Sequence, residues 1–75
     1  MELLCDIKVG SLAIVKENKA KSSLKERLLA LGVTKGAIIE ILRKGPKNNL
    51  TLYKIRGAMI ALRKEEASLI LVDII

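Results

Sequence analysis

The chain has 75 residues with 14 Lys and Arg against 8 Asp and Glu, which gives a net charge of +6. A chain of this length forms one domain over residues 1–75, and its core is too small to enclose the deep, dry cavity that most enzymes need. The positive charge favours an anionic partner, such as nucleic acid, lipid head groups or an acidic protein face, without choosing among them.

The core must be aliphatic, because hydrophobic residues make up 51% of the sequence while Tyr53 is its single aromatic residue. Cys5 is the single cysteine, so no intramolecular disulfide forms, as is usual in a reducing cytosol. The N-terminus does not resemble a signal peptide, and no apolar run approaches the roughly 20 residues that span a bilayer. We therefore expect a cytoplasmic protein.

In the first part of the chain, one strand is predicted before a helix and one strand after it. Residues 3–9 form either a helical turn or an extended lead-in that ends at Gly10. Residues 12–16 read as a strand, and residues 37–44, which are rich in β-branched side chains, read as the next. Ile39 and Ile41 are expected to point inward, because Glu40 and Lys44 share the other face.

A helix is predicted over residues 23–31. Ser23 and Glu26 have the spacing of a capping box, in which each side chain bonds the other residue's backbone N–H. Leucines recur at positions 24, 28 and 31 and form one apolar stripe. Gly32 supplies the left-handed residue that commonly ends a helix, and Gly36 closes a turn before the next strand.

The second part of the chain reads as three short strands over residues 50–56, 58–62 and 68–74. A turn cluster with the single proline (residues 45–49) precedes them, and a helical turn is expected at 63–67. Ile60 and Leu62 are expected to face inward. In the 50–56 strand the inward set is Thr51, Tyr53 and Ile55, and the outward set is Leu50, Leu52, Lys54 and Arg56. The pattern predicts a small, mainly β barrel or sandwich.

Residues for catalysis or metal binding are scarce. The chain has no histidine, which is the commonest general base and metal ligand. Cys5, Asp6 and Glu2 are weak candidates for a transition-metal site, and no cofactor is otherwise expected. Glu65 and Glu66 are interpreted as a solvated charged turn rather than as an acid–base pair. Nucleic-acid binding is not expected, because Tyr53 alone could stack on a base.

Four segments carry a resemblance to a known family. They are an apolar lead-in to Gly10, RLLALGVTKG (27–36), Arg56-Gly57 and ALRKEEASLILV (61–72). The sequence resembles the FeoA family over essentially its whole length, and the second and fourth segments are specific as a pair. One departure is the loop at 46–50, which reads PKNNL where the family usually has Pro-x-Gly-Asp-Pro.

The resemblance implies an SH3-like barrel of five to six strands with one inserted helix, the barrel also found at the C-terminus of iron-dependent repressors. It implies a non-catalytic accessory role in ferrous iron uptake, acting on the cytoplasmic domains of FeoB, a membrane transporter with a GTP-binding domain. Membrane association would then come only through that partner, at the inner face. Families of this fold are also described as binding transition metals.

The expected partner-binding surface is Leu50 and Leu52, rimmed by Lys47, Lys54 and Arg56, because modest interfaces combine an apolar centre with a charged rim. Alternatively, the two leucines pack under the inserted helix or at a homodimer seam. Two other functions stay open at this point: a basic nucleic-acid-binding barrel, and a metal sensor that uses Cys5 and nearby carboxylates.

Overall fold

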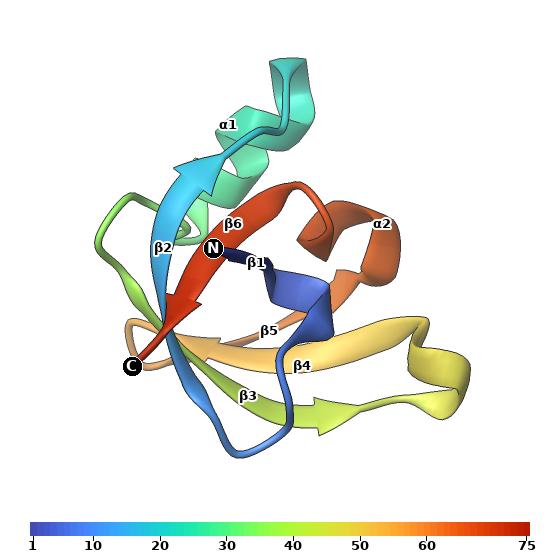
Figure 1. Cartoon of the computed structure of the whole chain (residues 1–75). Coiled ribbons are helices and arrows are strands. Elements are labelled where there is room, and N and C mark those ends of the chain that lie inside the picture. Colours follow the sequence, from blue (N-terminus) through green and yellow to red (C-terminus); the bar gives the residue numbers. More distant parts are fainter.

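The computed structural model describes all residues, 1–75, and shows one curved antiparallel sheet of six strands with two helices (Figure 1). The sheet order is β1-β6-β2-β3-β4-β5. The elements are β1 (Glu2–Leu3), β2 (Leu12–Asn18), α1 (Ser22–Ala30), β3 (Ile38–Lys44), β4 (Leu50–Ile55), β5 (Ala58–Arg63), α2 (Lys64–Ala67) and β6 (Ile70–Ile74). The prediction of a mainly β domain with one inserted helix is confirmed.

The core is aliphatic and follows the alternation of the strands. Ile39 and Ile41 of β3 face Tyr53 and Ile55 of β4 inside the sheet, and all four are fully buried. Ala13 and Val15 of β2, with Ile70 and Val72 of β6, complete the barrel interior. The predicted inward faces of the strands are therefore confirmed, since a period of two places alternate side chains on one side of a sheet. The exception is Ile60, which is only partly buried, whereas Leu62 is buried as predicted.

The hairpin between β4 and β5 has a two-residue turn at Arg56 and Gly57. Both residues have positive φ, of 50° and 83°, and Ile55 pairs with Ala58 across the turn. This is the primed turn whose twist suits a right-handed hairpin, and it explains why a glycine lies at position 57. The turn fixes the register of β5 on β4.

The start of α1 differs from the prediction. The helix begins at Ser22, with Lys21 as the N-cap and no side chain capping it. The predicted capping box of Ser23 and Glu26 is wrong, because Ser23 lies inside the first turn rather than at the cap. A capping bond of this kind occurs at α2 instead, where the Arg63 backbone N–H donates to Glu66 Oε1 at 2.9 Å.

The end of α1 agrees with the prediction. Gly32 has φ of 100°, and its N–H donates to the Leu29 carbonyl at 3.0 Å, while the Val33 N–H donates to the Leu28 carbonyl at 2.9 Å. This pair of bonds is a Schellman motif. Leu28 and Val33 are both fully buried, so the motif places the end of α1 against the barrel.

The other elements differ only slightly from their predicted bounds. The lead-in contains both predicted forms, the short strand β1 paired with β6 and a 3₁₀ turn at Leu4–Asp6. β2 is longer than predicted, with a register shift between Val15 and Glu17, and β6 starts at Ile70 rather than at residue 68. Neither helix is both long and apolar enough to cross a membrane.

Candidate protein-docking groove

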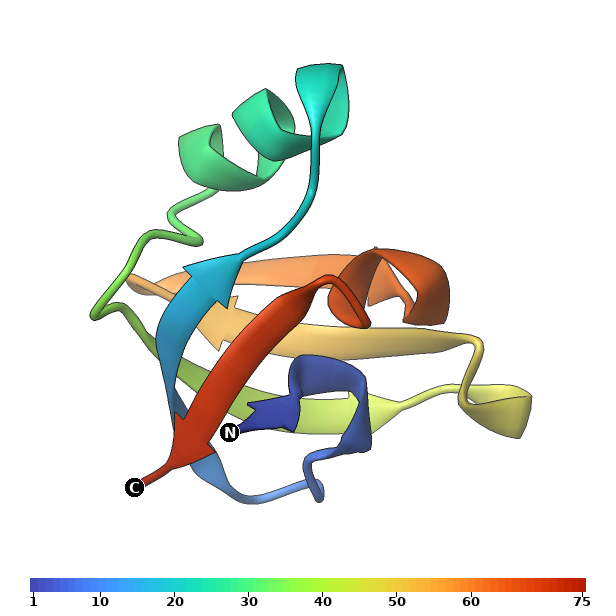
Figure 2. The same cartoon turned by 45° about the horizontal axis from the view of Figure 1, so that its top comes forward.

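A groove of about 630 Å³ lies between α1 and the hairpin edge of the barrel. Figure 2 shows α1 (green) standing above β5 (orange). Residues of both elements line the groove. Eight residues from α1, β4, β5 and α2 and from the residue after α1 line it: Arg27, Leu31, Leu50, Ile60, Ala61, Leu62, Arg63 and Glu66. Segments distant in sequence therefore meet at one surface hollow.

The groove has an apolar floor. Leu31 follows α1, Leu50 begins β4 and Ile60 lies in β5, and each keeps part of its side chain exposed. Leu50 is 46% exposed, so the inserted helix, which also borders the groove, does not cover it. Aliphatic side chains left open between two walls are suited to hold apolar side chains of another protein.

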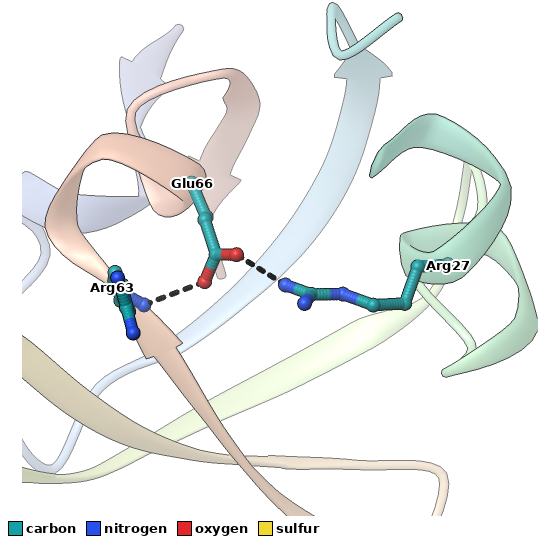
Figure 3. A network of polar contacts seen from close by, with 3 residues as sticks. All are labelled: Arg27, Arg63 and Glu66. Carbon is teal, nitrogen blue, oxygen red and sulfur yellow. Dashed lines mark hydrogen bonds and ion pairs between the residues drawn. The ribbon is translucent and has the colours of Figure 1, made fainter. Parts of the chain in front are cut away.

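A polar network joins α1 to α2, as Figure 3 shows, and its three residues line the groove. The guanidinium of Arg27 on α1 forms an ion pair with Glu66 Oε2 on α2, and Glu66 Oε1 accepts the Arg63 backbone N–H at 2.9 Å. The hydrogen bond from the Arg63 N–H, reinforced by Arg27, holds the pKa of the Glu66 carboxyl below its usual value. Glu66 is thus a bridge between α1 and the barrel.

This network was missed in the sequence. The prediction that Glu65 and Glu66 form a solvated turn is wrong for Glu66, which is half-buried, and is confirmed for the exposed Glu65. Arg27 and Glu66 are 39 residues apart, so no local pattern links them. The available signal was the position of Glu66 three residues after Arg63, the spacing of a helix-start carboxylate.

The structure does not gather all the residues predicted to bind a partner. Leu50 lines the groove, whereas Leu52 is half-buried and pairs with Ala61 on the neighbouring strand. Lys47 is exposed in the turn at Pro46–Asn48. Lys54 and Arg56 line a separate, smaller hollow beside the hairpin turn.

Arg56 is also used inside the molecule. Its Nη2 donates to Thr34 Oγ1 at 2.8 Å, and its Nε donates to the Gly32 carbonyl at 3.4 Å. Its Cδ lies 3.0 Å from where a Cβ at position 32 would stand, so a side chain there would press on Arg56, and the positive φ of Gly32 favours glycine independently. Arg56 therefore joins the hairpin turn to the segment that follows α1.

The weak metal candidates do not form a ligand cluster. The Cys5 thiol donates to Asp6 Oδ1 at 3.7 Å, and no three His, Cys, Asp or Glu residues lie close enough to hold a metal ion together. Burial, together with the charge of Asp6, raises the pKa of the Cys5 thiol. Since metals bind the thiolate, these residues fit a resident transition metal poorly.

The curved six-stranded barrel with a helix inserted between β2 and β3 places the chain in the class of small SH3-like domain proteins. The model of the FeoA domain matches residues 3–74, and the chain belongs to this family. No curated protein matches the chain in sequence. The family resemblance seen in the sequence is therefore confirmed.

Solved structures agree with this assignment. The FeoA protein of Chlorobium tepidum is 31% identical with a TM-score of 0.90, over 99% of this chain and 70% of that one. Iron(II) transport protein A of Clostridium thermocellum is 33% identical with a TM-score of 0.93, over 100% of this chain and 46% of that one. Both relatives thus share the whole of the present fold.

A third relative is the FeoA of Stenotrophomonas maltophilia, complexed with zinc and described as an SH3 domain protein. It is 28% identical with a TM-score of 0.82, over 93% of this chain and 87% of that one. A manganese-dependent transcriptional repressor shares the fold at 16% identity, over 41% of its length. The predicted likeness to repressor domains is confirmed at the level of fold.

Proposed function

We propose that this protein is a non-catalytic accessory protein of ferrous iron uptake that binds the cytoplasmic domains of a FeoB-type transporter and modulates its activity. Membership of the FeoA family supports the link to iron transport. The Stenotrophomonas relative is itself described as a candidate ferrous iron transport activating factor. The observation that carries the proposal is the open groove with Leu31, Leu50 and Ile60 on its floor.

The chemistry of the groove supports binding rather than turnover. Glu66 is the one carboxylate in its lining, and it is already held by Arg27 and by the Arg63 N–H. The lowered pKa of Glu66 keeps the side chain ionised near neutral pH, where it is a poor proton donor. No nucleophile with an adjacent base lines the groove, so the proposal assigns no catalytic residue and no cofactor.

The other functions have less support. Tyr53 is fully buried, which leaves no aromatic side chain to stack on a nucleic-acid base. A weakly bound transition metal at Cys5 and Asp6 stays a prediction from the sequence, as does a homodimer. In the proposed role the protein works in the cytoplasm and reaches the inner face of the membrane through its partner.

The proposal is tested by titrating the protein into the soluble cytoplasmic domain of the matching transporter. Leu50→Asp places a charge on the apolar floor and should weaken binding roughly ten-fold or more. Val9→Asp is the matched control, because Val9 is as exposed (51%, against 46% for Leu50) and does not line the groove. Circular dichroism should be unchanged in both variants.

Two results would overturn the proposal. If the wild-type protein does not bind the transporter domain, the partner is wrong. If Leu50→Asp and Val9→Asp bind as well as the wild type, the groove is not the binding surface.

A further inference from the structure

The strand β5 ends the sheet and has no neighbour on its outer side. In the order β1-β6-β2-β3-β4-β5, its only partner is β4. The other edge is the two-residue β1, so β5 is the long free edge of this fold. Unpaired N–H and C=O groups along an exposed edge form a template for another strand.

The register shows which backbone groups point outward. Ile55 and Ala58 close a two-residue hairpin, and a closing pair of this kind exchanges both of its hydrogen bonds. Bonded pairs alternate along an antiparallel ladder, so Ala58, Ile60 and Leu62 point their backbone groups at β4. The N–H and C=O groups of Met59 and Ala61 therefore point to the free edge, where both residues are exposed.

The groove runs along this same edge. Four consecutive residues of β5, from Ile60 to Arg63, line it. Neighbouring side chains of a strand point to opposite faces, so a groove touches four in a row when it follows the edge of the strand. Arg27 on α1 lines the groove from the opposite side, and Glu66, which accepts the Arg63 N–H, lines it as well.

We propose that an extended acidic segment of a partner protein adds to the barrel as a further strand along the Met59–Ala61 edge of β5. The inference rests on the proposed function and specifies how the partner is held. Main-chain bonds to Met59 and Ala61 supply affinity in this mode, and alternate side chains fill the apolar floor.

The charges around the groove favour an acidic segment of a partner protein. Arg63 is the cation in the groove lining that forms no ion pair, and Lys54 lies directly across the ladder from Met59. Glu66 is the one acidic residue in the lining, and its charge is already matched by Arg27. A second copy of this chain would bring the same cations, within a net charge of +6, against one another. An acidic segment meets the opposite charge along the same path.

The experiment uses the peptide acetyl-Glu-Val-Glu-Val-Glu-Val-amide as a probe of the full chain, followed by amide hydrogen exchange with NMR. The N–H groups of Met59 and Ala61 should exchange rapidly in the free protein and roughly ten-fold more slowly with saturating peptide. The N–H of Ile60, already bonded to β4, is the internal control. The same peptide with Lys in place of Glu should bind much more weakly.

Two backbone changes separate strand addition from side-chain docking. N-methylation of the peptide at every second residue should abolish binding in one frame and spare it in the other, because one edge of an added strand faces β5. Ala61→Pro removes one outward N–H and should weaken binding roughly ten-fold, whereas Ala61→Ser should not. If Ala61→Pro does not fold, binding of the methylated peptides to the wild-type protein still distinguishes strand addition from side-chain docking.

Several outcomes would overturn the inference. These are equal binding of both methylated frames, slow exchange at Met59 and Ala61 in the free protein with a dimer in solution, or no protection by the acidic peptide. If the transporter domain binds the wild type and Ala61→Pro equally, strand addition is wrong while the proposed function stands. If the transporter domain does not bind at all, the proposed function fails.

Discussion

The barrel and α1 are attached to the fold in different ways. Each central strand of the barrel has a hydrogen-bonded neighbour on both sides and buries alternate side chains such as Ile39 and Val72 completely. The backbone hydrogen bonds of α1 stay within the helix and the residues beside it. Leu28 is its one fully buried side chain, and Arg27 forms its one ion pair with the barrel.

This difference indicates where the molecule can adjust. One wall of the groove is β5, which is hydrogen-bonded to β4 along its length. The other is a helix held by the buried Leu28, the partly buried Leu24 and one ion pair. Segments with few buried contacts open at lower free energy than the core does. We therefore expect α1 to set the width of the groove, while β5 keeps its position.

The largest expected effects come from truncating a buried side chain in each region. Ile39→Ala and Leu28→Ala should each lower the free energy of unfolding by about 2–5 kcal/mol, because each leaves a cavity at a fully buried site. The two variants should differ in where protection from hydrogen exchange is lost. Ile39→Ala should speed exchange throughout the sheet, whereas Leu28→Ala should speed it mainly in α1. Equal loss in both variants would show that α1 and the barrel unfold as one unit.

A smaller effect on folding stability is expected at high pH, and it comes from a residue buried in the barrel. Burial raises the pKa of Tyr53 from 10.0 to about 12, against a smaller opposing effect of the nearby Thr51 side chain. The hydroxyl oxygen makes no hydrogen bond of ordinary geometry. Between these values the unfolded chain releases the proton while the folded chain keeps it, so stability falls as pH rises above 10. The loss should approach roughly 2 kcal/mol near pH 12.

Tyr53→Phe isolates this contribution. The variant should match the wild type within about 1 kcal/mol at pH 7, because it removes a hydroxyl that bonds nothing. Chemical denaturation across the alkaline range should show a shallower decline for Tyr53→Phe. Parallel declines would mean that the Tyr53 hydroxyl reaches water.

The smallest effect concerns the ion pair that joins α1 to α2. Glu66→Gln should cost at most about 1 kcal/mol at pH 7, because Arg27 is half exposed and solvent screens the pair. The pKa of Glu66 is lowered in the folded state, so its contribution is present above the ordinary value and is lost as pH falls through the lowered one. Wild type and Glu66→Gln should therefore converge in acid, as measured by denaturation. A difference that persists in acid would rule out the charge as its cause.

Much of the fold could be predicted because its signals are local. Alternation around Ile39 and Tyr53 predicted the inward faces of two strands, and Gly32 predicted the end of the helix. The start of the helix could not be read from Ser23, since the chain enters the helix one residue earlier, with Ser22 at a φ of 57°. A cap motif predicts a helix start only when the chain reaches it in an extended conformation.

The groove was harder to predict because it is assembled by long-range pairing. The exposure of Leu50 followed from alternation, but the groove that it shares with Leu31 depends on where α1 rests on the barrel. The free edge of β5 depends on the strand order of the whole sheet, which no segment of the sequence encodes alone. The contact between Arg27 and Glu66 likewise depends on long-range packing of α1 against the barrel.

The two ends of the chain lie on neighbouring strands. Glu2 in β1 pairs with Val72 in β6, and the N-terminal ammonium lies 3.6 Å from Asp73 Oδ1. A short peptide could join the ends without disturbing the sheet, and new ends could be opened in the exposed turn at Pro46–Asn48. The molecule is thus suited to circular permutation, with the N-terminal lead-in covalently continuous with the last strand.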